Sequence, residues 1–192
     1  MTKVVLIGDS VREGYQKYVQ AELAAEAEVW APDENGGTSR NVLNHLDEWV
    51  LRREPDIVHV NCGLHDIARE FGSRVRNIPL EEYESNVREV LRRASQGIKG
   101  TVIWAATTPV NEAWHRQRKP FDRLESDVQA YNESAARAAR VLGIPIDDLF
   151  GVIMAAGRDK CLSPDGVHFD EAARALLGKA VADFIRPYLD RP

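Results

Sequence analysis

Short runs of consecutive apolar residues alternate along the chain with longer segments in which apolar residues recur every three or four positions. A continuous apolar run such as Val4–Ile7 is typical of a strand that is buried on both faces of a parallel sheet. The pattern predicts five strands, at Lys3–Ile7, Glu28–Trp30, Ile57–Asn61, Thr101–Ala106 and Pro145–Asp147.

The segments between these strands have the periodicity of helices that bury one face. Tyr15, Val19 and Leu23 lie four residues apart, and similar stripes occur in 42–50, 83–91, 124–135 and 177–188. Regular alternation of strand and helix predicts an α/β fold with right-handed crossovers. We expect a three-layer α/β/α sandwich around a five-stranded parallel sheet, similar to flavodoxin. No repeat or linker interrupts the pattern, so residues 1–192 are expected to form a single domain.

Four long segments are predicted to be loops, and loops of this length are often functional in compact domains. They are Ala31–Ser39, Gly63–Pro79, Thr107–Asp122 and Arg158–Phe169. Each follows a strand or precedes a helix, so several of them can meet at one edge of the sheet.

Composition and charge narrow the function classes. The chain is 44% hydrophobic and 29% charged, which argues against disorder, and its formal net charge of −5 argues against nucleic acid or an anionic membrane as a partner. No apolar stretch is long enough for a membrane helix, and Met1–Lys3 leads directly into the first strand, so we expect a cytoplasmic protein. The sequence does not predict an oligomeric state.

The cysteine and histidine positions do not match a metal site or a disulfide framework. Cys62 and Cys161 are expected to be reduced thiols, with Cys62 close enough to a candidate site loop for oxidation to matter. The five histidines lack the spacing of metal ligands, so we expect chemistry without a metal or another cofactor. His45 and His59 are expected to be structural or solvent-facing.

The candidate chemistry begins at Ser10, which directly follows the first predicted strand and the strand-breaking Gly8. A hydroxyl at such a turn lies at the carboxyl edge of the sheet, where open α/β folds bind ligands. Near the other end of the chain, His168 can act as a base, and Asp165 can orient its ring. Asp170 then has the position of the N-cap of the last helix.

The order of these blocks resembles the SGNH (GDSL-type) serine hydrolases from Val4 to about Phe169. The resemblance rests on Gly8-Asp9-Ser10, the glycine block Asn35–Ser39, the Gly-x-x-Asp block 63–66, and Asp-x-x-His before the last helix. It implies ester hydrolysis with Ser10 as nucleophile, His168 as base and Asp165 as its partner. It also implies an oxyanion hole from the Ser10 N–H, the Gly36 N–H and a third donor, with Gly37 as the alternative to Gly36.

The third block departs from the family pattern, because His65 stands where the family usually has asparagine. A neutral imidazole has one N–H and can donate to an oxyanion. His65 is therefore a candidate oxyanion donor, with ligand contact or a structural role as alternatives. Asn61 is a weaker substitute donor.

Basic and aromatic residues are concentrated in the predicted loop after Val110, and Trp114 and Arg116 are the candidate substrate-binding residues. They suit an anionic or polyhydroxylated ester, although a solvated surface loop explains them equally well. We expect a small-molecule ester substrate, with carbohydrate O-acetylesters favoured over lysophospholipids, thioesters or aryl esters. A weakly catalytic binding protein or a purely structural α/β domain are the competing interpretations.

Overall fold

The computed structural model describes residues 1–189, and a five-stranded sheet in the order β2-β1-β3-β4-β5 lies at its centre. The strands are β1 (Thr2–Ile7), β2 (Ala27–Trp30), β3 (Ile57–Val60), β4 (Thr101–Ala105) and β5 (Ile146–Asp147). Every neighbouring pair is parallel. The predicted five-stranded parallel sheet is confirmed, and each strand end differs from the prediction by at most one residue.

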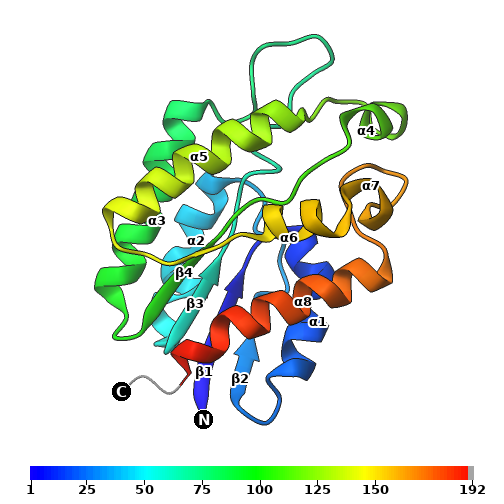
Figure 1. Ribbon diagram of the computed structural model, residues 1–192. Helices are drawn as coiled ribbons and strands as arrows, with labels where there is room; N and C mark the ends of the chain where they lie inside the picture. The colour runs from blue at the N-terminus through cyan, green and yellow to red at the C-terminus, as the bar shows by residue number, and fades with distance from the viewer. Residues whose placement is uncertain (190–192) are drawn as a thin grey trace.

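Helices cover both faces of this sheet, which gives the predicted three layers (Figure 1). On one face α1 (Ser10–Glu22) packs against α8 (Glu171–Ile185). On the other face α3 (Leu80–Gly97) packs against both α2 (Ser39–Trp49) and α5 (Glu125–Val141). The apolar stripes of these five helices supply much of the core, since their repeating residues are buried.

The sequence pattern missed three further helices, α4 (Glu112–Arg118), α6 (Leu149–Ala156) and α7 (Arg158–Cys161). The predicted loops 107–122 and 158–169 therefore each contain a short helix. In α4 only His115 is buried, so the helix shows no apolar stripe, and its start is marked instead by Asn111, whose side chain accepts from the Trp114 N–H. In α6 nearly every residue is apolar, so no polar face reveals the helical period. Two 3₁₀ turns, η1 (Leu51–Arg53) and η2 (Arg186–Tyr188), complete the described elements.

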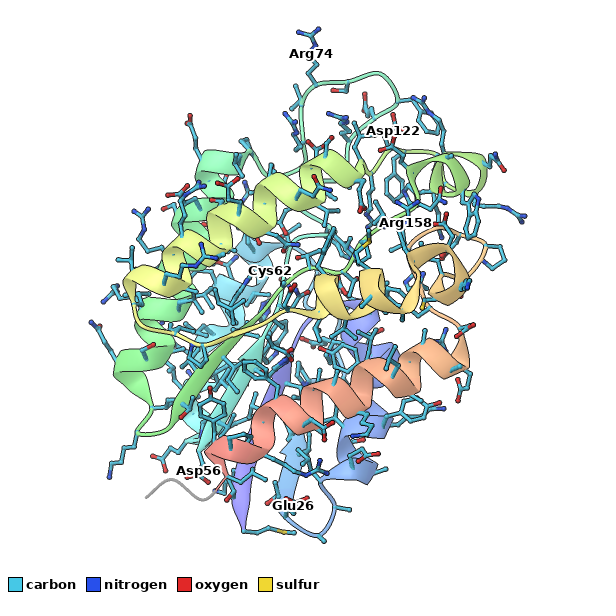
Figure 2. All side chains as sticks on the ribbon, viewed as in Figure 1. Glu26, Asp56, Cys62, Arg74, Asp122 and Arg158 are labelled. Atoms are coloured by element: carbon cyan, nitrogen blue, oxygen red, sulfur yellow. The ribbon has the colours of Figure 1, made fainter. Side chains whose placement is uncertain are left out.

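Buried tyrosines tie the long loop after β3 to the helices beside it. Tyr83 of α3 donates its hydroxyl to the Cys62 carbonyl at 3.0 Å, and Tyr131 of α5 donates to the Ile78 carbonyl at 2.6 Å. Both ends of the segment 62–78 are thus held by enclosed hydrogen bonds, which are costly to leave unmade in a protein interior. Figure 2 shows Cys62 deep in the molecule and Arg74 at the far tip of this segment.

The polar pair His59–Asp147 crosses the sheet from β3 to β5, with 2.9 Å between Nε2 and Oδ2. His59 is fully enclosed, which agrees with the predicted structural role. The alternative prediction, that His59 faces solvent, is wrong. His45 packs its ring against Trp49 within α2, with 4.5 Å between the centroids. Among residues 1–189, no helix combines the length and apolar character needed to cross a bilayer.

Candidate active site

Ser10 lies at the first position of α1, directly after the turn that ends β1. Asp9 caps the helix, because its side chain accepts from the Val11 N–H at 2.9 Å. A first-turn N–H of a helix has no partner within the helix. Within residues 1–189 the Ser10 N–H makes no hydrogen bond, so it is available to a ligand oxygen beside the Ser10 hydroxyl.

His168 and Asp165 lie in line behind the Ser10 hydroxyl. Ser10 Oγ is 2.8 Å from His168 Nε2, and His168 Nδ1 is 2.5 Å from Asp165 Oδ2. Three positions that the sequence analysis singled out are thus brought together from opposite ends of the chain. The arrangement is that of a hydroxyl with a base to take its proton and an acid to orient the base.

The loop that carries both residues is held firmly at its ends. The Ser163 N–H donates to the His168 carbonyl at 2.7 Å, and the Asp170 N–H donates to the Cys161 carbonyl at 3.0 Å. Asp170 caps α8 as predicted, accepting from the Ala173 N–H at 2.8 Å. Gly166 supplies the left-handed conformation in between, with φ of 72°. His168 therefore projects from a closed turn.

Asp165 is held in its charged form. Partial burial opposes that charge, but hydrogen bonds from the His168 ring and from the His168 and Val167 N–H groups outweigh it and lower the Asp165 pKa to about 2. Asp165 is therefore an anion at neutral pH. An anion at this place favours the tautomer of His168 that leaves Nε2 free to accept the Ser10 proton.

Arg12 ties the serine turn to the glycine loop that precedes α2. Its guanidinium Nη2 donates to the Glu34 carbonyl at 3.0 Å and, at 3.4 Å, to the Gly8 carbonyl. Nη1 donates to Gln16 Oε1, and only 2% of the Arg12 surface is exposed. The sequence analysis did not find this role, because the acceptors are main-chain carbonyls that no spacing rule reveals.

The two glycine N–H groups proposed as oxyanion donors both have protein acceptors here. The Gly36 N–H donates to the Gly8 carbonyl at 2.9 Å, and the Gly37 N–H donates to Asn35 Oδ1 at 2.9 Å. Gly36 is buried against the serine turn, where a Cβ would come 2.7 Å from the Gly8 oxygen. The structure therefore explains why position 36 is glycine, and a Gly36 donor would have to share or release its bond to Gly8.

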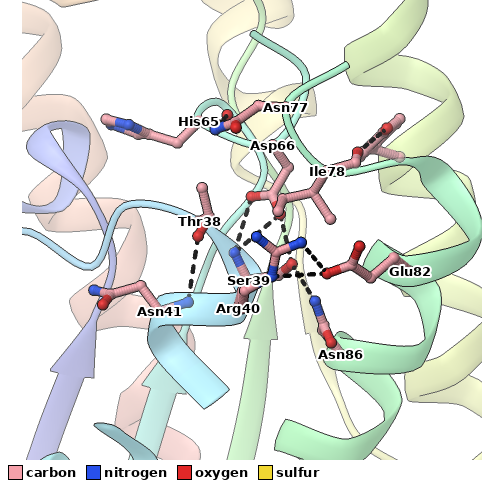
Figure 3. Close-up of polar contacts among 11 residues, drawn as sticks. Thr38, Ser39, Arg40, Asn41, His65, Asp66, Asn77, Ile78, Glu82 and Asn86 are labelled. Carbon is pink, nitrogen blue, oxygen red and sulfur yellow. Dashed lines mark hydrogen bonds and ion pairs between the residues drawn. The ribbon is translucent and has the colours of Figure 1, made fainter. Parts of the chain in front are cut away.

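His65 and Asp66 leave the loop after β3 in different directions (Figure 3). His65 is partly exposed, and burial, followed by the positive charge of Arg123, lowers its pKa, so the ring is neutral at pH 7. The charge of Asp9 raises the pKa of this ring and that of His168 lowers it, so His65 interacts electrostatically with the residues around Ser10. Asn61 uses its amide nitrogen within the protein, donating to the Ala105 carbonyl at 2.8 Å and to Thr107 Oγ1 at 3.4 Å, so it would have to release one of these bonds to serve as a substitute donor.

Asp66 is fully enclosed and connects the same loop to α2 (Figure 3). Its Oδ1 accepts from the Ser39 N–H at 2.9 Å and from Ser39 Oγ at 2.5 Å, while Asn86 donates to Ser39 Oγ at 3.1 Å. Burial raises the Asp66 pKa to about 7, although the bonds from Ser39 work in the opposite direction. This network fixes the base of the segment that carries His65.

Comparison with known proteins agrees with this geometry. The family model of the GDSL-like lipase/acylhydrolases matches residues 6–176. The chain belongs to this family. It is therefore an ester hydrolase of the GDSL type, and the matched segment includes Ser10, Asp165 and His168.

Relatives of this GDSL-type hydrolase share its fold at low sequence identity. An acetylxylan esterase of Geobacillus stearothermophilus is 23% identical over 203 residues, which cover 93% of this chain and 91% of the relative. The crystal structure of a lipase/acylhydrolase from Enterococcus faecalis has a TM-score of 0.81 at 24% identity, covering 97% of this chain and 96% of that one. The crystal structure of Axe2, an acetylxylan esterase from Geobacillus stearothermophilus, has a TM-score of 0.74 at 20% identity and covers 100% and 95% of the two chains.

Trp114 and Arg116 of the hydrolase face different cavities. Trp114 lines a cavity of about 330 Å³ that also includes Leu162 and Pro164 of the segment leading to the Asp165–His168 loop. Arg116 lines a second cavity of about 500 Å³, which also includes Asp122. The Arg116 guanidinium donates to the Asp122 carboxylate at 2.9 Å. The two candidate substrate-binding residues are thus not brought together, and Trp114 is the one nearer the Asp165–His168 loop.

Cys62 is enclosed, and burial raises the pKa of its thiol well above the usual range. A thiol without thiolate character reacts slowly with oxidants and alkylating agents. In residues 1–189 no three His, Cys, Asp or Glu side chains gather as they would around a metal ion.

Proposed function

We propose that this GDSL-type acylhydrolase is a serine esterase that cleaves small acyl esters through an acyl-enzyme intermediate, with O-acetylated carbohydrate as its substrate class. The observation that carries the proposal is the continuous hydrogen-bonded line from Ser10 Oγ through His168 to Asp165, with contacts of 2.8 and 2.5 Å.

In the first half-reaction Ser10 Oγ attacks the ester carbonyl carbon while its proton passes to His168 Nε2. The resulting tetrahedral intermediate collapses, the bond to the alcohol oxygen breaks, and His168 returns the proton to the departing alcohol. Water then attacks the acyl-enzyme with His168 again as base, which releases the carboxylic acid and restores Ser10. Asp165 stays ionised throughout and stabilises the imidazolium form of His168.

The negative charge that forms on the carbonyl oxygen needs hydrogen-bond donors. We assign the Ser10 N–H, the Gly36 N–H and the His65 ring to this oxyanion hole. The Ser10 N–H is free, and His65 is a neutral ring with one N–H to give. For Gly36 the assignment requires its bond to the Gly8 carbonyl to be shared or released when substrate binds.

The name acetylxylan esterase, carried by a relative and by a solved structure from the same organism, supports acetylated carbohydrate as the substrate class. Trp114 suits this class, because an indole beside the catalytic loop can stack on a sugar ring. A lysophospholipid or a thioester is the alternative, to be separated by experiment.

Labelling with a fluorophosphonate probe tests the nucleophile. Wild-type protein should be labelled once and Ser10→Ala not at all, with Ser163→Ala of the neighbouring turn as the matched serine control. Labelling that survives Ser10→Ala, or a wild type that neither reacts nor hydrolyses any ester, would refute the proposal and favour a binding protein on this fold.

Substrate class and the role of His65 need separate measurements. Turnover should be highest with acetylated xylo-oligosaccharides and should fall with acyl length across 4-nitrophenyl acetate, butanoate and octanoate. Removing an oxyanion donor typically costs about 10²–10³ in kcat. We therefore expect His65→Ala to lose about that much and His65→Asn to recover most of it. Full activity of His65→Ala would remove His65 from the oxyanion hole.

A further inference from the structure

Arg123 is a nearly buried cation whose role the esterase chemistry above does not explain. Only 7% of its surface is exposed, although arginine is among the residues least often buried. Its Nε donates to the Leu64 carbonyl at 2.6 Å, and its guanidinium lies 5.1 Å from the centroid of the Phe121 ring. The side chain is therefore fixed against the loop that carries His65.

No carboxylate of residues 1–189 forms an ion pair with Arg123. The neighbouring arginines do have such partners: Arg116 pairs with Asp122 at 2.9 Å, and Arg76 pairs with Asp127 at 2.6 Å. A buried charge without a partner is costly, and buried charges in proteins are usually paired.

The two terminal nitrogens of Arg123 are its unused donors. Neither bonds to another described residue, and neither is among the enclosed polar atoms that lack a partner. The small exposed area of Arg123 therefore includes the tip of the guanidinium, while the rest of the side chain is enclosed. Two adjacent N–H donors on a fixed planar group are suited to hold a carboxylate by two parallel bonds.

Arg123 is anchored beside the active-site region. Leu64, which anchors Arg123, directly precedes His65 in the chain, and the charge of Arg123 lowers the pKa of His65. Asp165 and Asp9 attract the guanidinium from the catalytic side. Asp165 binds His168, and Asp9 caps α1 through Oδ1 while its Oδ2 accepts no hydrogen bond. Neither carboxylate forms an ion pair with Arg123, so the terminal nitrogens of Arg123 are left for an anion from outside the chain.

The surface beyond Arg123 is also basic. Main-chain pairing of Arg69 with Asp122, at 2.8 and 3.1 Å, brings the loop after β3 beside the segment that ends at Arg123. The cavity of about 500 Å³ at this junction is lined by four arginines and one aspartate, the arginines being Arg69, Arg74, Arg76 and Arg116. In an acidic protein, such a local excess of positive charge attracts anionic substrates toward one side of the site.

We infer that Arg123 is a specificity-determining residue that binds a carboxylate carried by the ester substrate, so that the enzyme prefers esters with an acidic group near the scissile bond. This inference rests on the proposed esterase activity and adds the charge of the substrate to it. An acetylated sugar acid fits both the acyl group proposed above and the planar anion that a guanidinium binds best.

A matched pair of substrates tests the inference. 4-Acetoxybenzoate and its methyl ester carry the same acetyl group and differ in one negative charge. Wild-type enzyme should show the higher kcat/KM with 4-acetoxybenzoate. Hydrogen bonds to a charged group contribute about 1.5–3 kcal/mol, which corresponds to about 10- to 100-fold. Arg123→Gln should lose about that factor with the acid, mostly through KM, and change less than about threefold with the methyl ester. Arg52→Gln, which removes an exposed arginine of η1 near the amino end of β3, is the matched control and should leave the preference intact.

A second measurement needs no variant and covers the case that Arg123→Gln fails to fold. With the methyl ester as substrate, 4-hydroxybenzoate should inhibit the wild type at least about tenfold more strongly than 4-hydroxybenzamide. Equal inhibition, or equal loss of both ester activities in Arg123→Gln, would overturn the inference. If the wild type hydrolyses the methyl ester through Ser10 but shows no preference for the acid, only this inference fails. If neither ester is hydrolysed and Ser10 is not labelled, the proposed esterase activity fails as well.

Discussion

Replacing Asp66 by asparagine should stabilise the protein at alkaline pH and much less at acidic pH. Asp66 is fully enclosed, and its pKa is raised from 3.8 to about 7, chiefly by burial. Below pH 3.8 the carboxyl is protonated in both the folded and the unfolded state. Between pH 3.8 and 7 the unfolded chain releases the proton while the folded chain keeps it, so the free energy of unfolding falls as pH rises. Asparagine does not ionise, so the free energy of unfolding of the variant does not fall in this way as pH rises.

The size of the effect follows from the two pKa values. One pKa unit corresponds to about 1.4 kcal/mol, so a shift of about three units sets an upper limit of about 4 kcal/mol. At pH 5.5 the wild type has already lost just over half of this free energy. It loses about 2 kcal/mol more between pH 5.5 and 8.0. The two shorter bonds to Ser39 should survive, because Oδ1 accepts both of them, at 2.5 and 2.9 Å, and an amide oxygen can take its place. The longer contact from the Ser39 N–H to Oδ2, at 3.1 Å, is lost in the variant, and this loss lowers stability at both pH values without changing the predicted difference between them.

Urea unfolding at pH 5.5 and at pH 8.0 gives the required free energies. The stability of Asp66→Asn relative to wild type should rise by about 2 kcal/mol between the two values. Asp33→Asn, at an exposed position of the loop before Gly36, makes the same change of residue type where the carboxyl is not buried and serves as the control. A stability difference between Asp66→Asn and wild type that is the same at both pH values would show that Asp66 does not keep its proton, and would refute the reasoning.

Three further outcomes test other parts of the site. Gly166→Ala should destabilise the protein by more than about 1 kcal/mol and lower kcat, because the residue has φ of 72° and a Cβ would lie 2.4 Å from the Asn111 carbonyl; a variant with unchanged melting temperature and kcat would contradict this. Arg12→Gln should lower kcat with little change in KM, since Arg12 holds the main chain of the serine turn and the glycine loop together and touches no substrate; a rise in KM alone would assign it to binding instead. Cys62 should resist 5,5′-dithiobis(2-nitrobenzoic acid) in the folded enzyme and react only when urea unfolds it, so rapid native labelling, mapped by peptide mass, would show that its loop opens.

The sheet and the Ser10–His168–Asp165 line could be predicted because their signals are local. An apolar run ending at Gly8 marks β1 and the position of Ser10, and the Asp165–His168 spacing places an acid and a base on one turn. Helix α4 could not be predicted from periodicity, because a short helix with one buried residue leaves no stripe. The bonds of Arg12 and Arg123 were also missed, because both arginines bind main-chain carbonyls. Every residue has such a carbonyl, so the sequence does not indicate which one an arginine will bind.

The bond from the Gly36 N–H to the Gly8 carbonyl has a mechanical consequence. With Arg12 bound to the same carbonyl and to Glu34, the serine turn, the start of α1 and the glycine loop form one body. A thermal displacement of the serine turn therefore carries the glycine loop with it. The distance between Ser10 and the glycine loop stays constant, while both move relative to the turn that carries His168. In the proposed mechanism, the distance that fluctuates should be the one across which the proton travels, from Ser10 to His168.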